Sequence, residues 1–301
     1  MRGLPASGKS TRAKEIMAQS GNMVRINKDL LRKMLHFNRW TGVNERITRG
    51  VARAIVKELA SNKAGGVIID DTNLSQGTYQ SWLDLAKELG ASVQTITMDT
   101  PIDECLRRDR EREDSVGDHV IYEMALKADL YKPAKGFVIC DFDGTLADIM
   151  HRVHNVNKKV CCSVCKGEAC KNSHCICHDK NWKAFFADIE KDKPRTDVMQ
   201  MIVDYNAQGY DVFIVSGRPD DTREASQAWL DRFIDRSVYK ALIMRKAGDR
   251  RDDVIVKGEI FDQLFKDPAK VITCIDDRPK VIRMWREKGL SVTDVGSGFE
   301  F

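Results

Sequence analysis

"FVICDFDGTLAD", residues 137–148, decides the fold of the second half of the chain. Its first four residues form an apolar run with the length of a buried strand, and Asp141 and Asp143 follow directly. The apolar runs in "VFIVSGR" (212–218) and "VITCIDDR" (271–278) end in polar residues in the same way. Short buried strands separated by helical stretches predict an α/β domain, a doubly wound parallel sheet with helices on both faces.

The polar residues after these strands are the candidate catalytic groups. Because the carboxyl ends of parallel strands meet at one edge of a sheet, residues far apart in the sequence can converge there. For any single aspartate, a solvated turn residue is the simpler interpretation, but four such pieces in this order favour one common site. The candidate set, with one lysine from a helical stretch, is Asp141, Asp143, Ser216, Gly217, Arg218, Lys257, Asp276 and Asp277.

The types of these side chains suit hydrolysis of a phosphate ester through a covalent intermediate. Asp141 can attack phosphorus, and Asp143 can protonate the leaving oxygen and later activate a water molecule. Ser216 and Lys257 would hold the phosphoryl oxygens. The two aspartates of "VITCIDDR" offer the hard oxygen ligands that magnesium prefers.

A second motif opens the chain: "GLPASGKS", residues 3–10, fits the phosphate-binding pattern G-x-x-x-x-G-K-[ST]. The backbone N–H groups of such a loop can cradle the phosphates of ATP, with the lysine as counter-charge and the serine placed for magnesium. The ATP-binding set is Gly3, Gly8, Lys9, Ser10 and Thr11. "VIID" (67–70) and "SVQTITMD" (92–99) are expected to be strands, and the helical patterns between them predict a second parallel α/β sheet. One expected helix has a buried stripe made of Val43, Ile47, Val51, Ile55 and Leu59.

Taken together, these motifs resemble a known family. "DFDGTLAD", "SGR", the lysine and "DDR" resemble the haloacid dehalogenase superfamily of phosphatases. With the phosphate loop added, nearly the whole chain outside residues 155–180 resembles the bacteriophage polynucleotide kinase 3′-phosphatases. The resemblance implies that Thr145 orients Asp143 and that Arg218 lies beside the substrate phosphate. It also implies magnesium ligation by Asp141, Asp143, Asp276 and Asp277.

The same resemblance assigns residues in the first half. In "INKDLLRKM" (26–34) it implies that Asp29 is the general base for a 5′-hydroxyl and that Arg32 contacts the acceptor phosphate. In "RRDRERE" (107–113) it implies that Arg108 and Arg112 grip the transferred phosphoryl group, although a solvated helix face is the alternative. Asp71 matches the position that braces the acceptor-binding arginine, with helix capping as the alternative.

The proline and glycine of "LYKPAKG", residues 130–136, predict the domain boundary. We expect a P-loop polynucleotide kinase domain over 1–132 and a phosphatase domain over 133–301. Only Met1 and Arg2 precede the phosphate loop, so the strand that normally leads into such a loop is expected to be missing. A start placed too late, a trimmed chain and a genuinely lost strand are the alternatives, and the survival of the kinase residues favours a shortened reading frame.

A cysteine cluster, "CCSVCKGEACKNSHCICH" (161–178), interrupts the phosphatase pattern within an insertion of about 155–180. Its spacing resembles a zinc knuckle and predicts a structural zinc site. The expected ligands are Cys162, Cys165, Cys170 and Cys175, with His174, Cys177 and His178 as substitutes. A loop with reduced thiols and adventitious disulfides are the alternatives.

Composition limits the function classes only weakly. The net charge of +4, from 49 basic and 45 acidic residues, neither requires nor excludes a nucleic-acid partner. No apolar run is long enough for a membrane span and no signal peptide is visible, so we expect a cytoplasmic protein without a membrane partner, in the infected host if the chain is phage-encoded. RNA versus DNA and homo-oligomer formation stay open.

The function expected from these features is the healing of RNA or DNA ends. The enzyme would remove 3′-phosphates through an aspartyl-phosphate and transfer the γ-phosphate of ATP to 5′-hydroxyl ends, with magnesium. Two alternatives stay open. One is a phosphatase whose first domain only binds nucleotide or is an inactive kinase, and the other joins a small-metabolite kinase to a sugar-phosphate phosphatase.

Overall fold

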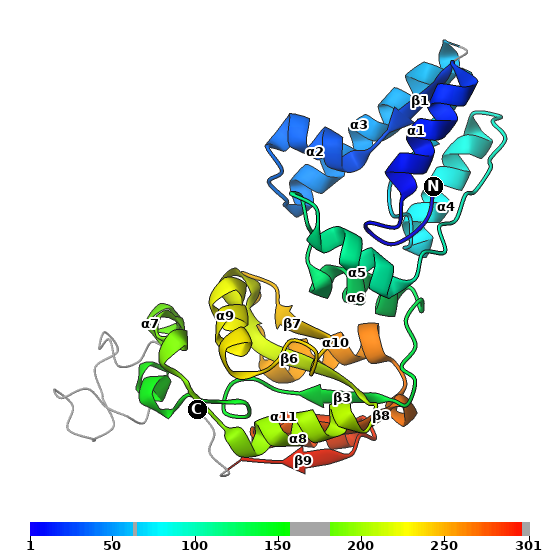
Figure 1. The fold of residues 1–301 in the computed structure, drawn as a ribbon. Helices are drawn as coiled ribbons and strands as arrows, with labels where there is room; N and C mark the ends of the chain where they lie inside the picture. Colours follow the sequence, from blue (N-terminus) through cyan, green and yellow to red (C-terminus); the bar gives the residue numbers. More distant parts are fainter. Residues whose placement is uncertain (63–64, 157–180, 297–301) are drawn as a thin grey trace. The chain divides into compact units, whose positions relative to one another are not determined.

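The computed structural model describes residues 1–62, 65–156 and 181–296 (Figure 1). The chain divides into two compact units, Met1–Tyr131 (unit 1) and Lys132–Phe301 (unit 2), and each is described by itself. Both units have the α/β composition expected from the sequence, with parallel strand pairs between helices.

Unit 1 is built around a small parallel sheet. Its strands β1 and β2 pair in parallel, with Met23 opposite Gly66. Asn27 caps α2 through its side chain, and Thr41 caps α3 in the same way, which explains where these helices begin. The elements are α1 (Lys9–Ser20), β1 (Met23–Ile26), α2 (Lys28–His36), α3 (Gly42–Ser61), β2 (Gly66–Ile69), α4 (Gln76–Glu88), α5 (Ile102–Arg110) and α6 (Asp118–Lys127).

The strand expected over 92–99 is reduced to one bridged residue, Thr97, which pairs in parallel with Arg2. Arg2 N donates to Ile96 O at 2.8 Å, and Met98 N donates to Arg2 O at 2.8 Å. Because a strand is held by its ladder partner, a two-residue partner supports no more pairing than this. The Met1 ammonium donates to Ile69 O at 2.9 Å, so residues 1–2 occupy the place next to β2 where we expected no strand partner at all.

The buried stripe expected on α3 is wrong: none of its five residues is fully buried, and Val51, Ile55 and Leu59 are half-buried. Val43 is 62% exposed and Ile47 is 45% exposed, whereas the buried residues of this helix are Thr48 and Ala52. Helical periodicity identifies an apolar face but not what covers it. α3 contacts α2, but this contact does not cover the apolar side chains in the first turns of α3, which stay exposed to solvent.

Unit 2 contains a five-stranded parallel sheet in the order β7-β6-β3-β8-β9 (Figure 1). A short antiparallel pair, β4 with β5, stands apart from it. The strands are β3 (Phe137–Cys140), β4 (Ala147–Asp148), β5 (Lys193–Pro194), β6 (Asp211–Pro219), β7 (Ala241–Arg245), β8 (Val271–Asp276) and β9 (Val292–Asp294). The helices are η1 (Met150–Asn155), α7 (Trp182–Ala187), α8 (Thr196–Ala207), α9 (Arg223–Phe233), α10 (Asp253–Ile260), η5 (Phe261–Phe265) and α11 (Pro279–Glu287).

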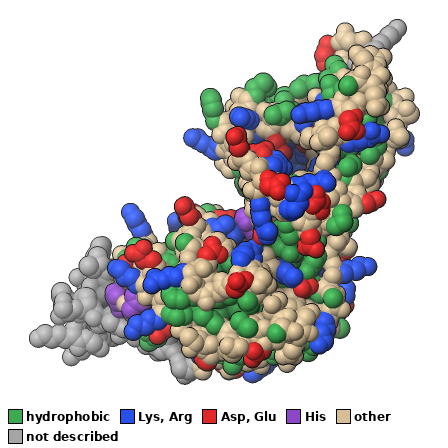
Figure 2. Space-filling view, viewed as in Figure 1, with side chains coloured by type: hydrophobic (Ala, Val, Ile, Leu, Met, Phe, Trp, Pro, Cys, Tyr) green, Lys and Arg blue, Asp and Glu red, His purple; other side chains and the backbone are tan. Residues whose placement is uncertain are grey.

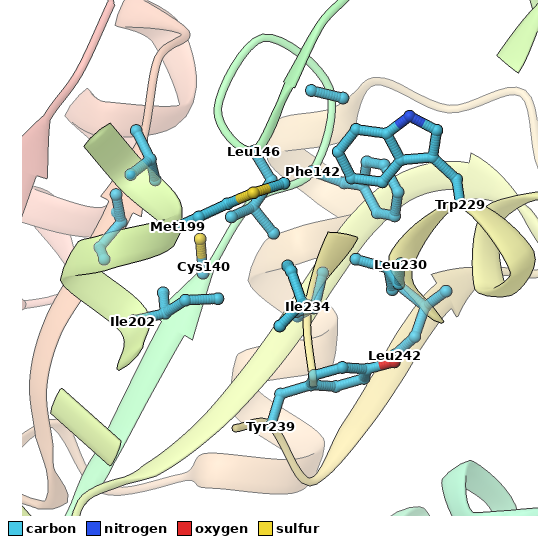
Figure 3. Close-up of a cluster of buried hydrophobic side chains, with 14 of the residues drawn as sticks. Cys140, Phe142, Leu146, Met199, Ile202, Trp229, Leu230, Ile234, Tyr239 and Leu242 are labelled. Atoms are coloured by element: carbon cyan, nitrogen blue, oxygen red, sulfur yellow. The ribbon is translucent and has the colours of Figure 1, made fainter. Parts of the chain in front are cut away.

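Helices cover both faces of this sheet, as the sequence predicted. Cys140 of β3 packs in one apolar cluster with Met199 of α8 and Trp229 of α9 (Figure 3). Phe137, on the opposite face of the same strand, contacts Phe265 of η5 at a ring-centroid distance of 5.3 Å. Since side chains of a strand alternate between faces, this division follows directly from the all-apolar run "FVIC". The central strand is therefore buried on both faces up to the carboxyl end that carries the candidate site.

Among the described residues, no helix combines the length and hydropathy that a membrane crossing requires.

Candidate active sites

The carboxyl end of β3 carries the first candidate residue, Asp141, which is 6% exposed. The loop that follows turns at Gly144, where φ is +82°. A Cβ atom at this position would lie 2.2 Å from Asp277 Oδ2. Only glycine fits so close an approach in this conformation, which accounts for the glycine of "DFDGT".

Asp141, Lys257 and Asp276 come together as the sequence predicted. Lys257 Nζ lies 2.7 Å from Asp141 Oδ1 and 2.9 Å from Asp276 Oδ2. Thr145 was expected to orient Asp143, but its hydroxyl donates to Asp277 Oδ1 at 2.9 Å. Ser216, in the second half of β6, is fully buried, and its Oγ accepts a hydrogen bond from Arg218 N at 3.1 Å.

The charges of this group are strongly coupled. Burial raises the pKa of Asp141 well above its ordinary value, and Lys257 opposes that rise while Asp276 adds to it. Burial and the neighbouring Asp276 also raise the pKa of Asp277. For Lys257, burial alone would lower the pKa, but Asp141 and Asp276 raise it well above the ordinary value. Three neighbouring carboxylates therefore share this site, with Lys257 and Arg278 as the positive charges beside them.

A divalent cation fits this donor set. Oxygen atoms of Asp141, Asp276 and Asp277 all lie within 4.8 Å of one another. Carboxylates are the ligands that magnesium prefers, and a bound cation would relieve the repulsion by which Asp276 raises the pKa of Asp141 and Asp277. The side chain of Asp143, which we expected among the magnesium ligands, points to arginines instead.

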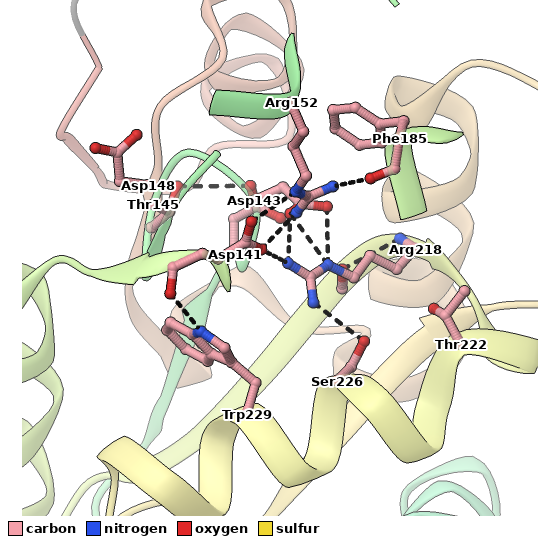
Figure 4. A network of polar contacts seen from close by, with 12 residues as sticks. Asp141, Asp143, Thr145, Asp148, Arg152, Phe185, Arg218, Thr222, Ser226 and Trp229 are labelled. Atoms are coloured by element: carbon pink, nitrogen blue, oxygen red, sulfur yellow. Dashed lines mark hydrogen bonds and ion pairs between the residues drawn. The ribbon is translucent and has the colours of Figure 1, made fainter. Parts of the chain in front are cut away.

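Asp143 is held by two buried guanidinium groups (Figure 4). Arg218 donates to Asp143 through Nε at 3.0 Å and Nη2 at 2.6 Å, and Arg152 Nη2 donates to it at 2.6 Å. Burial alone would raise the pKa of Asp143, but the two arginines hold it well below its ordinary range. In this state Asp143 is a carboxylate and cannot yet act as an acid.

A second carboxylate, Asp192, completes this cluster. It accepts from Arg152 Nε and Nη2, both at 2.6 Å, and from Arg218 Nη2 at 2.8 Å. The side chains of Arg152, Arg218 and Asp192 are all 0% exposed. We did not predict Arg152 or Asp192 from the sequence, because neither belongs to a motif, and Asp192 lies within the charged run "EKDK" (190–193).

A cavity of 1240 Å³ in unit 2 opens onto Asp141 and Asp143. Aromatic rings line one part of it, where Trp182 and Phe186 stack with centroids 5.9 Å apart. Basic side chains of the lining include Lys183, Arg250 and Lys280. This volume exceeds that of an inorganic phosphate by far and is large enough for a nucleotide.

In unit 1, the phosphate loop leads into α1. Gly8 caps this helix with φ at +92°, and no side chain of the described residues caps the first turn. The open N–H groups of a helix start form an anion site. Lys9 is 8% exposed and its ammonium donates to Leu4 O, so it folds back over the loop, while Ser10 and Thr11 are exposed. Burial lowers the pKa of Lys9.

The predicted acceptor residues lie on α2. Arg32 Nη1 donates to Asp29 Oδ1 at 2.6 Å, and Arg32 Nε donates to Glu45 of α3. Asp71, which we expected to brace Arg32, instead accepts from Lys28 N at 3.0 Å. Glu45 of α3, and not Asp71, therefore contacts Arg32; we did not predict this contact, because α3 was expected only as a packing helix.

The two predicted lid arginines differ in their surroundings. A Cβ atom built on Gly8 would lie 3.7 Å from Arg108 Nη1, which places this guanidinium beside the phosphate loop. Arg112 pairs with Asp114 through Nε at 2.9 Å and Nη2 at 2.7 Å. Arg112 is also near enough to Lys9 to contribute to the lowering of its pKa. The zinc ligands predicted between 162 and 178 lie outside the described residues.

Comparison with protein families agrees with this geometry. Residues 175–299 match the phosphatase domain of polynucleotide kinase PNKP, and residues 1–130 match an AAA domain. Each of the two models covers less than half of the 301 residues, and the two matched ranges do not overlap. The match of the phosphatase domain begins after Asp141 and Asp143, so the roles of these two residues rest on their positions at the sheet edge.

Individual relatives carry similar names. A protein of Autographa californica nuclear polyhedrosis virus, described as a bifunctional polynucleotide kinase/RNA ligase, is 26% identical over 95% of this chain and 40% of its own length. The L-seryl-tRNA(Sec) kinase of Methanococcus maripaludis is 32% identical over 42% of this chain and 50% of its own length. The chain thus spans half or less of these curated relatives.

The chain is also similar to solved structures. A chain of the Pnkp1/Rnl/Hen1 RNA repair complex is 26% identical, with 99% of this chain and 95% of that chain covered at a TM-score of 0.39. A haloacid dehalogenase-like hydrolase from Streptococcus pneumoniae is 13% identical, with 53% of this chain and 83% of that chain covered at a TM-score of 0.39.

Proposed function

We propose that unit 2 removes phosphate from the 3′ ends of RNA or DNA. The observation that carries the proposal is the convergence of Asp141, Lys257 and Asp276 at the carboxyl edge of one sheet, at distances of 2.7 and 2.9 Å. The match to a polynucleotide kinase phosphatase domain supports a nucleic-acid substrate. The size of the cavity above Asp141 supports a substrate larger than phosphate itself.

The reaction would proceed in two halves. An Oδ atom of Asp141 bonds to phosphorus while the bond from phosphorus to the 3′ oxygen breaks, and Asp143 gives that oxygen a proton. Asp143 then takes a proton from a water molecule whose oxygen bonds to phosphorus, and inorganic phosphate leaves Asp141. Lys257 and Ser216 would hold the phosphoryl oxygens throughout. Magnesium bound by the carboxylate cluster would offset the charge of the approaching phosphate.

Asp143 must gain a proton before it can act as an acid. In the described state Arg152 and Arg218 keep it ionised. A substrate phosphate carries charges that compete for these same guanidinium groups. Substrate binding would therefore loosen the hold on Asp143 and let its pKa rise toward the range that proton donation needs.

The test is release of phosphate from a 3′-phosphorylated oligonucleotide with magnesium. Asp141→Asn should abolish release, because an amide is not an anionic nucleophile, and retained activity in this variant would overturn the assignment. Asp143→Asn should still bind the oligonucleotide while turnover falls steeply. If a sugar phosphate outcompetes a nucleoside 3′-monophosphate, the substrate class proposed here is wrong.

We propose that unit 1 transfers the γ-phosphate of ATP to a 5′-hydroxyl end. Lys9 and the free backbone N–H groups in the first turn of α1, which no side chain caps, would hold the ATP phosphates. Ser10 would face magnesium. Asp29 would accept the proton of the 5′-hydroxyl while Arg32 contacts the acceptor phosphate. The placement of Arg108 beside Gly8 supports a role at the transferred group.

Kinase activity is tested separately from phosphatase activity. Lys9→Ala should remove 5′ phosphorylation, and Arg32→Ala should mainly raise the KM for the acceptor, while phosphate release stays near the wild-type rate. If the wild-type chain binds ATP but phosphorylates no 5′-hydroxyl acceptor, unit 1 is a nucleotide-binding domain only. If both activities fall together in these variants, two independent sites do not exist.

A further inference from the structure

Unit 1 exposes an apolar surface that the proposed function does not use. It runs along one face of α2, through the connecting turn and into the first turns of α3, and we call it the α2–α3 surface. Its exposed fractions range from 45% at Ile47 to 93% at Phe37. Its members are Leu30, Met34, Phe37, Trp40, Val43 and Ile47. An exposed apolar cluster of this kind marks a binding surface more often than a random feature.

The backbone holds the most exposed member of this surface in an unfavourable conformation. Phe37 ends α2 in the left-handed region, with φ at +50°, and Asn38 continues it with φ at +62°. A bulky side chain rarely adopts this conformation. The backbone N–H of Phe37 caps α2 by donating to Lys33 O at 3.1 Å, while the residue is 93% exposed. Glycine or asparagine usually fills such a cap, so the exposed aromatic ring at this position is what needs an explanation.

The charges around the surface are almost all positive. Between residues 30 and 50 the only carboxylate is Glu45, and Arg32 already pairs with it. The basic residues of this segment are Arg32, Lys33, Arg39, Arg46 and Arg49. Figure 2 shows hydrophobic and basic side chains exposed beside one another in the part of unit 1 that Figure 1 labels α2 and α3. Basic and exposed aromatic side chains together complement a ligand that carries both negative charges and exposed aromatic rings.

The same composition argues against a second copy of the chain. A two-fold interface would place this basic surface against itself, and the cores of protein interfaces are depleted of charge. Single-stranded nucleic acid matches both features at once, because its bases stack on aromatic rings and its phosphates pair with lysine and arginine.

We propose that the α2–α3 surface binds the single strand that leads away from the 5′-hydroxyl end. This inference rests on the proposed kinase function of unit 1. Asp29, at the start of α2, and Phe37, at its end, are about 12 Å apart along the helix axis at 1.5 Å per residue. With the terminal nucleotide at Asp29, the following bases stack on Phe37 and Trp40, and the basic residues contact the phosphates.

The experiment combines photo-crosslinking with kinetics on the full chain. A 5′-hydroxyl, 3′-hydroxyl oligonucleotide with 5-iodouridine at its second or third position should crosslink to Phe37 or Trp40. In an Asp141→Asn background, which removes the proposed phosphatase, Phe37→Ala and Trp40→Ala should each raise the KM for a twelve-nucleotide acceptor roughly tenfold more than the KM for a nucleoside 3′-monophosphate. Phe37→Tyr should restore the oligonucleotide KM. Val93→Ala, which shortens an exposed apolar residue elsewhere in unit 1, is the control.

The outcomes separate this inference from the proposed function. If the kinase phosphorylates both acceptors but the KM values change equally and the crosslinks map elsewhere, the surface does not bind the strand. If Phe37→Ala converts a dimer to a monomer in gel filtration without changing the KM ratio, the surface is a contact between copies, and the inference is wrong. Crosslinking to Phe37 or Trp40 in a chain that phosphorylates no acceptor would support the surface and refute the kinase.

Discussion

Replacement of Asp192 by asparagine tests whether the buried arginine pair holds unit 2 together. Asp192 accepts three hydrogen bonds from Arg152 and Arg218, at 2.6, 2.6 and 2.8 Å. Two guanidinium groups and two carboxylates balance one another in this cluster. Asparagine keeps the shape of the side chain but removes one negative charge, so one buried positive charge is left without compensation. Its NH2 group would also face the N–H donors of the arginines, with which it cannot form hydrogen bonds.

The expected cost follows from the burial of the cluster. Removal of one partner from a buried ion pair typically destabilises a protein by about 3–5 kcal/mol. With a urea dependence of about 2 kcal/mol per molar, the unfolding midpoint of unit 2 should fall by roughly 2 M. Equilibrium unfolding in urea, followed through residual phosphatase activity, reports on this unit specifically.

Asp188→Asn is the matched control. Asp188 is a nearby aspartate whose pair with Lys191, at 2.8 Å, is on the surface, with 43% and 60% of the two side chains exposed. Surface pairs contribute little, so its midpoint should stay close to that of the wild type. If Asp192→Asn unfolds at the same urea concentration as Asp188→Asn, the buried cluster does not stabilise unit 2, and our reasoning about its charge balance is refuted.

Three further predictions concern other parts of the chain. The folded-state pKa of Asp143 lies below its unfolded value of about 3.9; its ionised form therefore stabilises unit 2 above about pH 4, and the loss in free energy of unfolding caused by Asp143→Asn should shrink as the pH falls below that value. Gly144→Ala should reduce phosphate release and lower the melting temperature, because its Cβ would lie 2.2 Å from Asp277 Oδ2; an unchanged melting temperature would contradict this close packing. Elemental analysis should find about one zinc per chain, lost when Cys162 and Cys165 become serine, and zinc-free protein purified without chelator would refute the site.

The sheet of unit 2 and most of its candidate site could be predicted from the sequence. A buried parallel strand is a continuous apolar run, and whatever follows it stands at the carboxyl edge of the sheet. The positions of Asp141 and Asp276 are therefore largely fixed by the runs "FVIC" and "VITCI". The burial of both faces of β3 was also predictable, because every residue of "FVIC" is apolar.

The partners of Asp143 were not predictable in the same way. Arg152 lies in a 3-10 turn and Asp192 in a loop, and neither position carries a periodic pattern. A charged residue in a short irregular segment usually faces solvent, so its burial shows only when the tertiary structure is known. The contact of Glu45 with Arg32 and the exposure of the first apolar residues of α3 were not predictable for the same reason. Periodicity does not report which element packs against a helix.

The charged residues assigned to substrate phosphate share one property in both units: each is already paired within the chain. Arg218 is bound to Asp143, Arg32 to Asp29, and the ammonium of Lys9 to a carbonyl of its own loop. A buried cation without a partner costs several kcal/mol, so a chain that gathers cations must also supply their acceptors. When a phosphate binds here, each cation exchanges its partner within the chain for a phosphate oxygen. No cation is unpaired before the phosphate arrives. The affinity is then the difference between two pairings, and the carboxylates released by the exchange, Asp143 and Asp29, are the residues to which proton transfer is assigned.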